Sequence, residues 1–209
     1  HGMAVRKGNP QVVYRETVAA AGAAESVFER EIAERHVKVV TTVTVSPAPR
    51  GSGVRIPDGY RLLGLPAEVA DGVEMGLREG AFFGSLGYPV DDVTVEVTRA
   101  EFLSGVPSPM AAKVAAAKAF QEAYEKGRPF LLEPVMAVEI SVAAVSLGGV
   151  IGDVNARRGK VTSVDRRPEG SLLSAQVPLK EMFGYVTALR SLSQGRGNYT
   201  MKFSHYDRA

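Results

Sequence analysis

The stretch EMFGYVTALRSLSQGRGNYTMKFSHY, residues Glu181–Tyr206, decides the fold of the second half of the chain. Apolar residues recur at helical spacing in its first part, which predicts an amphipathic helix over 181–194. Gly195 follows, at a position where helices often end in a left-handed residue. From Tyr199 to Phe203 apolar and polar residues alternate with the period of two that is typical of a strand. Helix, Gly-Arg-Gly turn and strand predict one part of an α+β sandwich.

The residues before this stretch extend the same pattern to six elements. Strands are predicted over 135–142, 160–166, 171–177 and 198–205, and helices over 147–158 and 181–194. A βαββαβ order in so short a segment predicts a ferredoxin-like split βαβ domain. Pro129 and Pro134 bracket a short apolar piece just before it, so we place the start of this domain at residue 129.

The first 128 residues predict a second α+β domain. We expect a strand over 11–18, an alanine-rich connector, a strand pair within 27–45, a loop over 47–59, a helix over 66–80, a strand over 91–99 and a helix from Ser108-Pro109 to Gly127. The strand HVKVVTTVTV is the clearest of these, because β-branched residues dominate it. In the last helix the spacing predicts a buried stripe made of Met110, Val114, Ala117, Phe120 and Tyr124.

Composition excludes several classes of site. The 209 residues contain no cysteine, so disulfides and thiolate metal sites are excluded, and the three histidines are too far apart in sequence for a zinc motif. No apolar run is long enough to span a membrane, and we expect no membrane partner. Residues 129–209 hold 10 Lys/Arg against 7 Asp/Glu, whereas residues 1–128 hold 15 against 16. This mild basic bias of the second domain is compatible with RNA contact.

The sequence predicts no catalytic centre in this chain. No glycine cluster ends in the Gly-Lys-Ser/Thr of a phosphate loop, and neither His36 nor His205 neighbours a nucleophile motif. Cations instead stand at the ends of elements, at Arg157, Arg158 and Arg196. The helix macrodipole favours arginine at the first two positions whatever the function. Arg196 differs, because flanking glycines allow close backbone approach while the guanidinium reaches a phosphate.

Six motifs spread over the chain resemble those of one known family. They are GNPQVVYRET (8–17), GYPVDDVTVEV (87–97), MAAKVAAAKAFQEAY (110–124), LLEPVMAVEI (131–140), GDVNARRG (152–159) and PLKEMFGYVTALRSLSQGRGNYTM (178–201). Together they are similar to the C-terminal part of elongation factor G, the translational GTPase that moves tRNA and mRNA through the ribosome. The last motif is long and nearly free of gaps, which makes the resemblance specific.

The resemblance implies two domains and a ribosomal partner. Residues 4–128 would form the fourth domain, with the split β-α-β fold of a ribosomal protein, and 129–209 the ferredoxin-like fifth domain. The tip of the fourth would enter the decoding region of the small subunit, and the fifth would contact rRNA near the sarcin–ricin loop and stalk base. GTP, Mg²⁺ and GTPase activity would belong to preceding domains of a cytoplasmic, monomeric protein, and this part would hold no cofactor. The candidate RNA contacts are Arg30, Arg35, His36, Lys38, Ser104, Gly105, Arg157, Arg158 and Arg196.

Two loops depart from the family pattern. EREIAERHV (29–37) is acidic and free of glycine where the family usually has a glycine-rich tip, and Leu103 stands about where a histidine is usual. The acidic residues would repel an RNA backbone. We therefore expect a diverged elongation-factor-G-like paralogue that acts in translocation or in ribosome recycling. Two alternatives are a ribosomal-protection factor of the tetracycline-resistance type and a non-ribosomal binding module that reuses both folds.

Overall fold

A computed structural model of the chain describes residues 13–32 and 34–209, which form two compact units. The first unit consists of Tyr14–Leu132 together with Arg208–Ala209, and the second unit of Glu133–Asp207 together with Val13. The boundary between Leu132 and Glu133 falls within a single long strand, Pro129–Val142. Each unit is described by itself.

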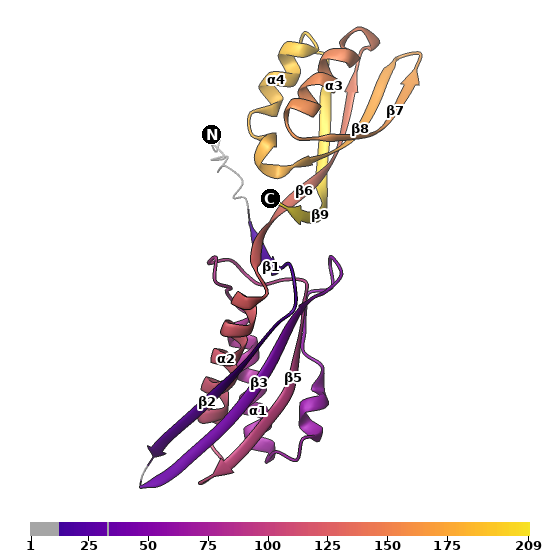
Figure 1. Cartoon of the computed structure of the whole chain (residues 1–209). Coiled ribbons are helices and arrows are strands. Elements are labelled where there is room, and N and C mark those ends of the chain that lie inside the picture. The colour runs from indigo at the N-terminus through magenta and orange to yellow at the C-terminus, as the bar shows by residue number, and fades with distance from the viewer. Residues whose placement is uncertain (1–12, 33) are drawn as a thin grey trace, which may run out of the picture. The chain divides into compact units, whose positions relative to one another are not determined.

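Each unit combines strands and helices (Figure 1). The first unit contains β1 (Arg15–Val18), β2 (Gly22–Ile32), β3 (Arg35–Pro47), β4 (Val54–Arg55), the 3-10 helix η1 (Asp58–Leu62), α1 (Ala67–Gly80), β5 (Val93–Ser104), α2 (Pro109–Lys126) and the start of β6 (Pro129–Val142). The second unit contains the rest of β6, the 3-10 helix η2 (Ala144–Ser146), α3 (Leu147–Ala156), β7 (Lys160–Arg167), β8 (Gly170–Pro178), the 3-10 helix η3 (Leu179–Met182), α4 (Tyr185–Leu192) and most of β9 (Asn198–Arg208).

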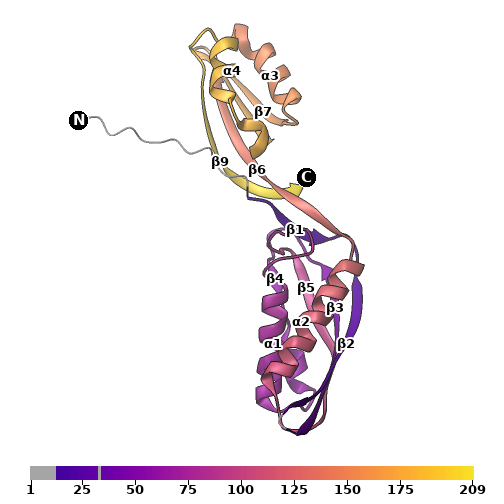
Figure 2. The ribbon, with the colours of Figure 1, turned by 90° about the vertical axis from the view of Figure 1, so that its left-hand side faces the viewer.

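A four-stranded sheet in the order β2-β3-β5-β4 forms the frame of the first unit. Helices α1 and α2 cover one face of this sheet, and the other face is open (Figures 1 and 2). Strand β3 turns Val37, Val39, Val43 and Val45 into the core beneath the helices. The prediction of a strand at HVKVVTTVTV is therefore confirmed.

The two helices of the first unit pack unusually closely. Gly72 and Gly76 of α1 face the backbone of α2, and a Cβ added at Gly76 would lie only 2.2 Å from the carbonyl oxygen of Lys113. The predicted buried stripe of α2 was wrong at Met110 and Val114, which are 63% and 44% exposed, and Ala117 is only partly buried. Small residues form the buried face instead, because only they permit this approach. The face consists of Ala111, Ala112, Ala115, Ala116, Ala119 and Ala123, with the predicted Phe120 and Tyr124.

The strands of the first unit are longer than the sequence predicted. The alanine-rich connector is wrong, since Ala23 and Ala24 belong to β2 and pair with Thr44 and Val43 of β3. Strand β5 runs on to Ser104, and register shifts against β3 let it continue past the predicted end at Arg99. The loop over 47–59 contains the two-residue strand β4. Of the strand predicted over 11–18, residues 11 and 12 lie outside the described residues.

The second unit has the predicted βαββαβ order. In its sheet β6 lies between β8 and β9, and β7 pairs with the other side of β8. Helices α3 and α4 cover one face (Figure 2). Their buried residues Val150 and Leu189 pack with Ile140 and Leu173 of the sheet into one core. The α+β fold predicted from the periodicities is thus confirmed.

The helix predicted over 181–194 is interrupted. The 3-10 turn η3 ends at Met182, Gly184 adopts a left-handed φ of 73°, and α4 begins only at Tyr185. A left-handed residue cannot continue a right-handed helix, so the apolar pattern crosses two short helices. The left-handed Gly195 was predicted correctly, with a φ of 77°. Helix α3 also ends two residues earlier than predicted, at Ala156.

Candidate nucleic-acid interface

The tip of the first unit is the β2–β3 hairpin with the loop that follows β5. Gly105 adopts a left-handed φ of 94°, and a Cβ on it would lie 2.3 Å from the carbonyl oxygen of His36. Only glycine fits this conformation and this approach. Ser104 pairs with Lys38 across the sheet. The structure thus brings four of the predicted contact residues, His36, Lys38, Ser104 and Gly105, into one small surface.

Glu29 of β2 occupies the centre of this tip surface. His36 lies between two partners, with Nε2 at 2.9 Å from Glu29 Oε1 and Nδ1 at 2.8 Å from Ser104 Oγ. Lys38 Nζ lies 3.0 Å from the other carboxylate oxygen of Glu29. The hydrogen bonds from Lys38 and His36 hold the pKa of Glu29 below its usual value, so the carboxylate stays charged. The predicted RNA contacts His36 and Lys38 are therefore already engaged by an acid.

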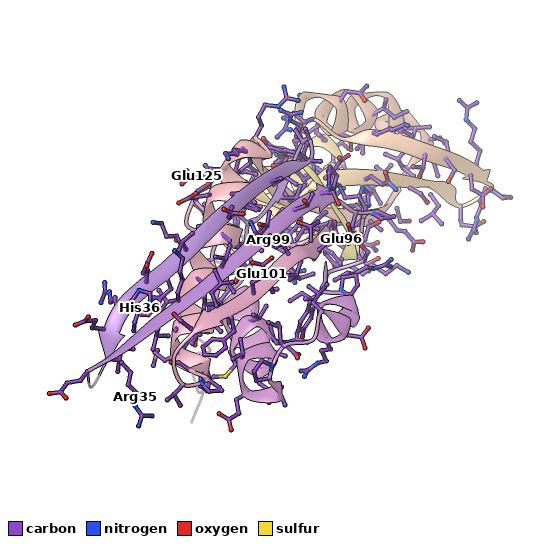
Figure 3. The ribbon with its side chains drawn as sticks, turned by 60° about the horizontal axis from the view of Figure 1, so that its bottom comes forward. Arg35, His36, Glu96, Arg99, Glu101 and Glu125 are labelled. Carbon is purple, nitrogen blue, oxygen red and sulfur yellow. The ribbon has the colours of Figure 1, made fainter. Side chains whose placement is uncertain are left out.

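The two tip arginines have no such acidic partner. The Arg30 guanidinium lies 5.5 Å from the centre of the Phe28 ring, in a cation–π arrangement. Arg35 begins β3 and extends from the end of the hairpin (Figure 3). Within residues 13–32 and 34–209 neither side chain forms an ion pair. Of the tip cations, these two remain available to an anionic partner.

Acidic residues also dominate the open face of the first sheet. Arg99 Nη1 lies 3.1 Å from Glu25, and Arg99 Nε lies 2.8 Å from Glu101. These neighbours, Glu101 above all, raise the pKa of Arg99. Glu96 lies on the same face (Figure 3). Since its arginine is held by two glutamates, this face offers little attraction to a phosphate backbone.

Arg157, in the second unit, has a structural role. Its Nε lies 2.8 Å from Asp153 Oδ2, and its Nη1 donates to the carbonyl oxygen of Glu181. The guanidinium also lies 5.0 Å from the centre of the Tyr185 ring. With a side chain only 19% exposed, Arg157 ties the end of α3 to the start of η3 and α4. Its guanidinium is engaged by groups of the second unit and does not extend into solvent.

Arg158 compensates a buried charge. Its Nη2 lies 2.8 Å from Oε1 of Glu133, whose side chain is 2% exposed. Lys180 Nζ lies 3.1 Å from the other carboxylate oxygen. Burying a charged carboxylate lowers the stability of the fold unless a cation pairs with it, so these two cations offset the cost of burying Glu133. Sequence reasoning missed Glu133, and its only signal is an acid between apolar residues of a strand.

Arg196 stands in the turn between α4 and β9. Ser193 fixes this turn, since its buried Oγ donates to the Leu189 carbonyl at 2.6 Å and accepts from the Gly197 amide at 2.8 Å. Arg196 is exposed, and its guanidinium has no hydrogen bond or ion pair within the described part of the chain. The same holds for Arg190 in the last turn of α4. This turn is therefore an exposed cationic feature of the second unit.

Neither a metal-ligand cluster nor a membrane-spanning helix occurs among the described residues. Among them no group of three or more His, Asp or Glu side chains could hold a metal ion. Over the same residues no helix is long and apolar enough to cross a membrane.

Comparison with protein families covers both units. A model described as "Elongation factor G, domain IV" matches residues 10–128, and one described as "Elongation factor G C-terminus" matches residues 130–209. The chain belongs to the elongation factor G family. The resemblance inferred from the sequence motifs is thereby confirmed.

Individual members of the elongation factor G family match nearly the whole chain. Elongation factor G of Aquifex pyrophilus is 39% identical over 208 residues, covering 99% of this chain and 30% of the relative. That of Thermotoga maritima is 40% identical, covering 98% and 30%. The chain therefore spans about 30% of the length of these relatives. A crystal structure of a protein from Thermus thermophilus superimposes with a TM-score of 0.80 at 29% identity, covering 96% of this chain and 30% of that one.

The curated relatives that match this chain are elongation factors G. The two matched regions contain no GTPase domain. Which residues contact RNA stays a prediction. The geometry favours Arg30, Arg35 and Arg196 among the predicted set, whereas Arg157 and Arg158 are engaged by acids of their own unit.

Proposed function

We propose that this chain is the ribosome-binding part of an elongation-factor-G-like GTPase. The first unit would reach toward the decoding region of the small subunit, and the second would contact large-subunit rRNA near the sarcin–ricin loop and stalk base. The longer protein would be monomeric and cytoplasmic, and its other domains would hold GTP and Mg²⁺. The observation that carries this proposal is identity of 39–40% to elongation factors G over 98–99% of the chain.

The charge distribution of the second unit supports contact with rRNA. Residues 182–206 contain no Asp or Glu, and they carry Arg190, Arg196 and Lys202. Unpaired cations on such a segment attract phosphates, and each phosphate contact releases counterions. The second unit would therefore supply much of the salt-dependent affinity.

The tip of the first unit supports a modified role in the decoding region. Glu29 engages His36 and Lys38, and Glu31 and Glu34 add further negative charge. A tip of this kind would hold RNA more weakly than one made of glycine and cations. We therefore place the protein in translocation with a weak tip contact, or in ribosome recycling. Replacing residues 29–35 by a glycine-rich loop in the full-length protein should accelerate translocation on purified ribosomes. Translocation by the native protein as fast as by a housekeeping factor would contradict the weak-tip argument.

Co-sedimentation tests ribosome binding directly. The 209-residue chain should pellet with intact ribosomes and with isolated large subunits, and elongation factor G of Thermotoga maritima should displace it. The apparent affinity should fall steeply as salt rises from roughly 50 to 200 mM. A chain that stays in the supernatant at low salt, while the full-length Thermotoga factor pellets, would refute ribosome binding by this part.

A further inference from the structure

A small open pocket lies where α4, the Gly-Arg-Gly turn and β9 meet. Its volume is about 200 Å³, and its lining residues are Val186, Leu189, Arg190, Gly197, Asn198 and Tyr199. All six belong to the second unit, so the unit alone fixes their geometry.

Apolar side chains line the pocket and pack against buried residues of the second unit. Leu189 is buried in the core of the second unit, whereas Val186 is 44% exposed at the mouth. The Tyr199 ring meets the buried Tyr185 ring edge-on, with the ring centres 4.9 Å apart. Tyr185 in turn lies under the guanidinium of Arg157. This stack holds the aromatic wall in place before any ligand arrives.

Three polar residues line the pocket or lie directly beside it. Asn198 is exposed at the first position of β9, and its amide can both donate and accept hydrogen bonds. Arg190 lines the pocket, and Arg196 directly precedes the lining residue Gly197 along the chain. Neither arginine has an acidic partner within the described residues, and no acid occurs from 182 to 206. Apolar side chains, one side-chain amide and two cations without an acidic partner thus lie at or beside the pocket.

We propose that this pocket binds a single unstacked nucleotide of RNA. The base would enter between Val186 and Tyr199 and place its polar edge on the Asn198 amide, while Arg190 and Arg196 bind the flanking phosphates. Proteins recognise RNA mainly at unpaired nucleotides, whose bases stack on side chains and expose their hydrogen-bonding edges. This inference deepens the proposed function and rests on it, because it names the feature of rRNA that the second unit recognises.

Simpler explanations account for only part of the arrangement. The macrodipole of α4 favours a cation near its C-terminus and so explains Arg190 alone. An acidic peptide would satisfy both arginines but would leave the apolar pocket and its amide without a partner. A nucleotide matches the apolar walls, the amide and the two cations together.

Binding to two RNA hairpins tests the proposal. One hairpin carries a single bulged nucleotide and the other is fully paired; both are fluorescently labelled and titrated with the 209-residue chain. The wild type should bind the bulged hairpin at least about tenfold more tightly than the paired one, since stacking of one base is worth that much. Asn198→Ala and Val186→Glu should abolish this preference. Both positions are exposed, so circular dichroism should show an intact fold.

A second arginine of the same unit serves as a control that distinguishes binding in the pocket from general attraction by positive charge. Arg196→Ala should lower the slope of log affinity against log salt by about 0.7–0.9 on the bulged hairpin. Arg166→Ala removes the same charge from β7 of the same unit, outside the pocket, and should leave the preference for the bulge unchanged. Equal loss of preference in both variants would show a non-specific cation effect and overturn the proposal.

Two further outcomes would also overturn it. If the wild type binds both hairpins equally, or if polyglutamate displaces the RNA better than unlabelled bulged hairpin does, the pocket does not select an unstacked nucleotide. Co-sedimentation with ribosomes distinguishes the two levels of the argument. Wild-type and Asn198→Ala chains that pellet equally well would leave ribosome binding intact and refute the pocket alone.

Discussion

Gly76→Ala should destabilise the first unit even though alanine is the better helix former. The added Cβ would lie 2.2 Å from the Lys113 carbonyl oxygen, a backbone atom that cannot rotate away. To reach the 3.0 Å that real Cβ atoms keep, α1 and α2 must separate by about 0.8 Å. Such overpacking costs up to about 3 kcal/mol, and the helix propensity of alanine offsets about 1 kcal/mol of it. The expected net loss is about 1–2 kcal/mol.

Thermal unfolding followed by far-UV circular dichroism measures this loss. The transition of the first unit should fall by roughly 4–8 °C. Gly152→Ala in α3 is the control, because a Cβ there meets nothing within 4 Å. It should stabilise the second unit by about 0.5–1 kcal/mol through helix propensity alone. If Gly76→Ala raises the transition as Gly152→Ala does, the close helix contact does not exist.

Three further predictions concern the first unit. Glu29→Gln should release the neighbouring histidine and lysine and steepen the salt dependence of RNA affinity. Glu25→Gln removes the same charge farther from the tip, where Arg99 stays bound to Glu101, and should change tip-dependent ribosome binding less. Equal effects of the two substitutions would remove Glu29 from the tip argument. Hydrogen bonds from Arg61, Arg78 and Tyr60 hold the pKa of Glu74 at about 2, against a usual 4.5. The stability that these hydrogen bonds provide to the folded protein is present above pH 4.5 and is lost as the pH falls toward 2. In acid denaturation, a Glu74→Gln variant should therefore lose less stability over this pH range than the wild type does. Gly105→Ala should lower the free energy of unfolding, measured in urea, by about 1–3 kcal/mol. Gly51→Ala should lower it less, because both glycines have a left-handed φ but only Gly105 lies against a backbone carbonyl.

Local patterns predicted much of the fold because the physics that sets them is local. The β-branched run of β3 favours an extended chain wherever it occurs, and a Ser-Pro pair starts α2. The Ser108 hydroxyl does accept a hydrogen bond from the Ala111 amide, at 3.2 Å. The βαββαβ order of the second unit follows from the same periodicities. None of these needed a distant contact.

The predictions from the sequence failed where contacts between residues distant in sequence determine the structure. The periodicity of α2 favoured Met110 and Val114 as core residues, but α1 presents glycines to it, and this close approach selects the alanine face. Glu29 looked only like a repulsive charge, because sequence spacing does not show that β2 lies against β3 in a register that sets it opposite Lys38. Glu133 could not be foreseen as a buried acid, since its partners Arg158 and Lys180 come from later elements. In each case the deciding partner lies on another element.

An acid engages two of the predicted contact residues at the tip of the first unit, whereas the cations of residues 182–206 in the second unit have no acid in their segment, and this difference bears on how each surface would act on RNA. In the first unit Glu29 lies beside His36 and Lys38, so these cations are neutralised before RNA arrives. In the second unit Arg190 and Arg196 stand in a segment without any acid. Association should therefore depend more on Arg190 and Arg196 than on His36 and Lys38, since free cations govern salt-dependent affinity. The tip of the first unit would act through the shape that Gly105 fixes, so tip substitutions should alter the step performed on the ribosome more than the affinity for it.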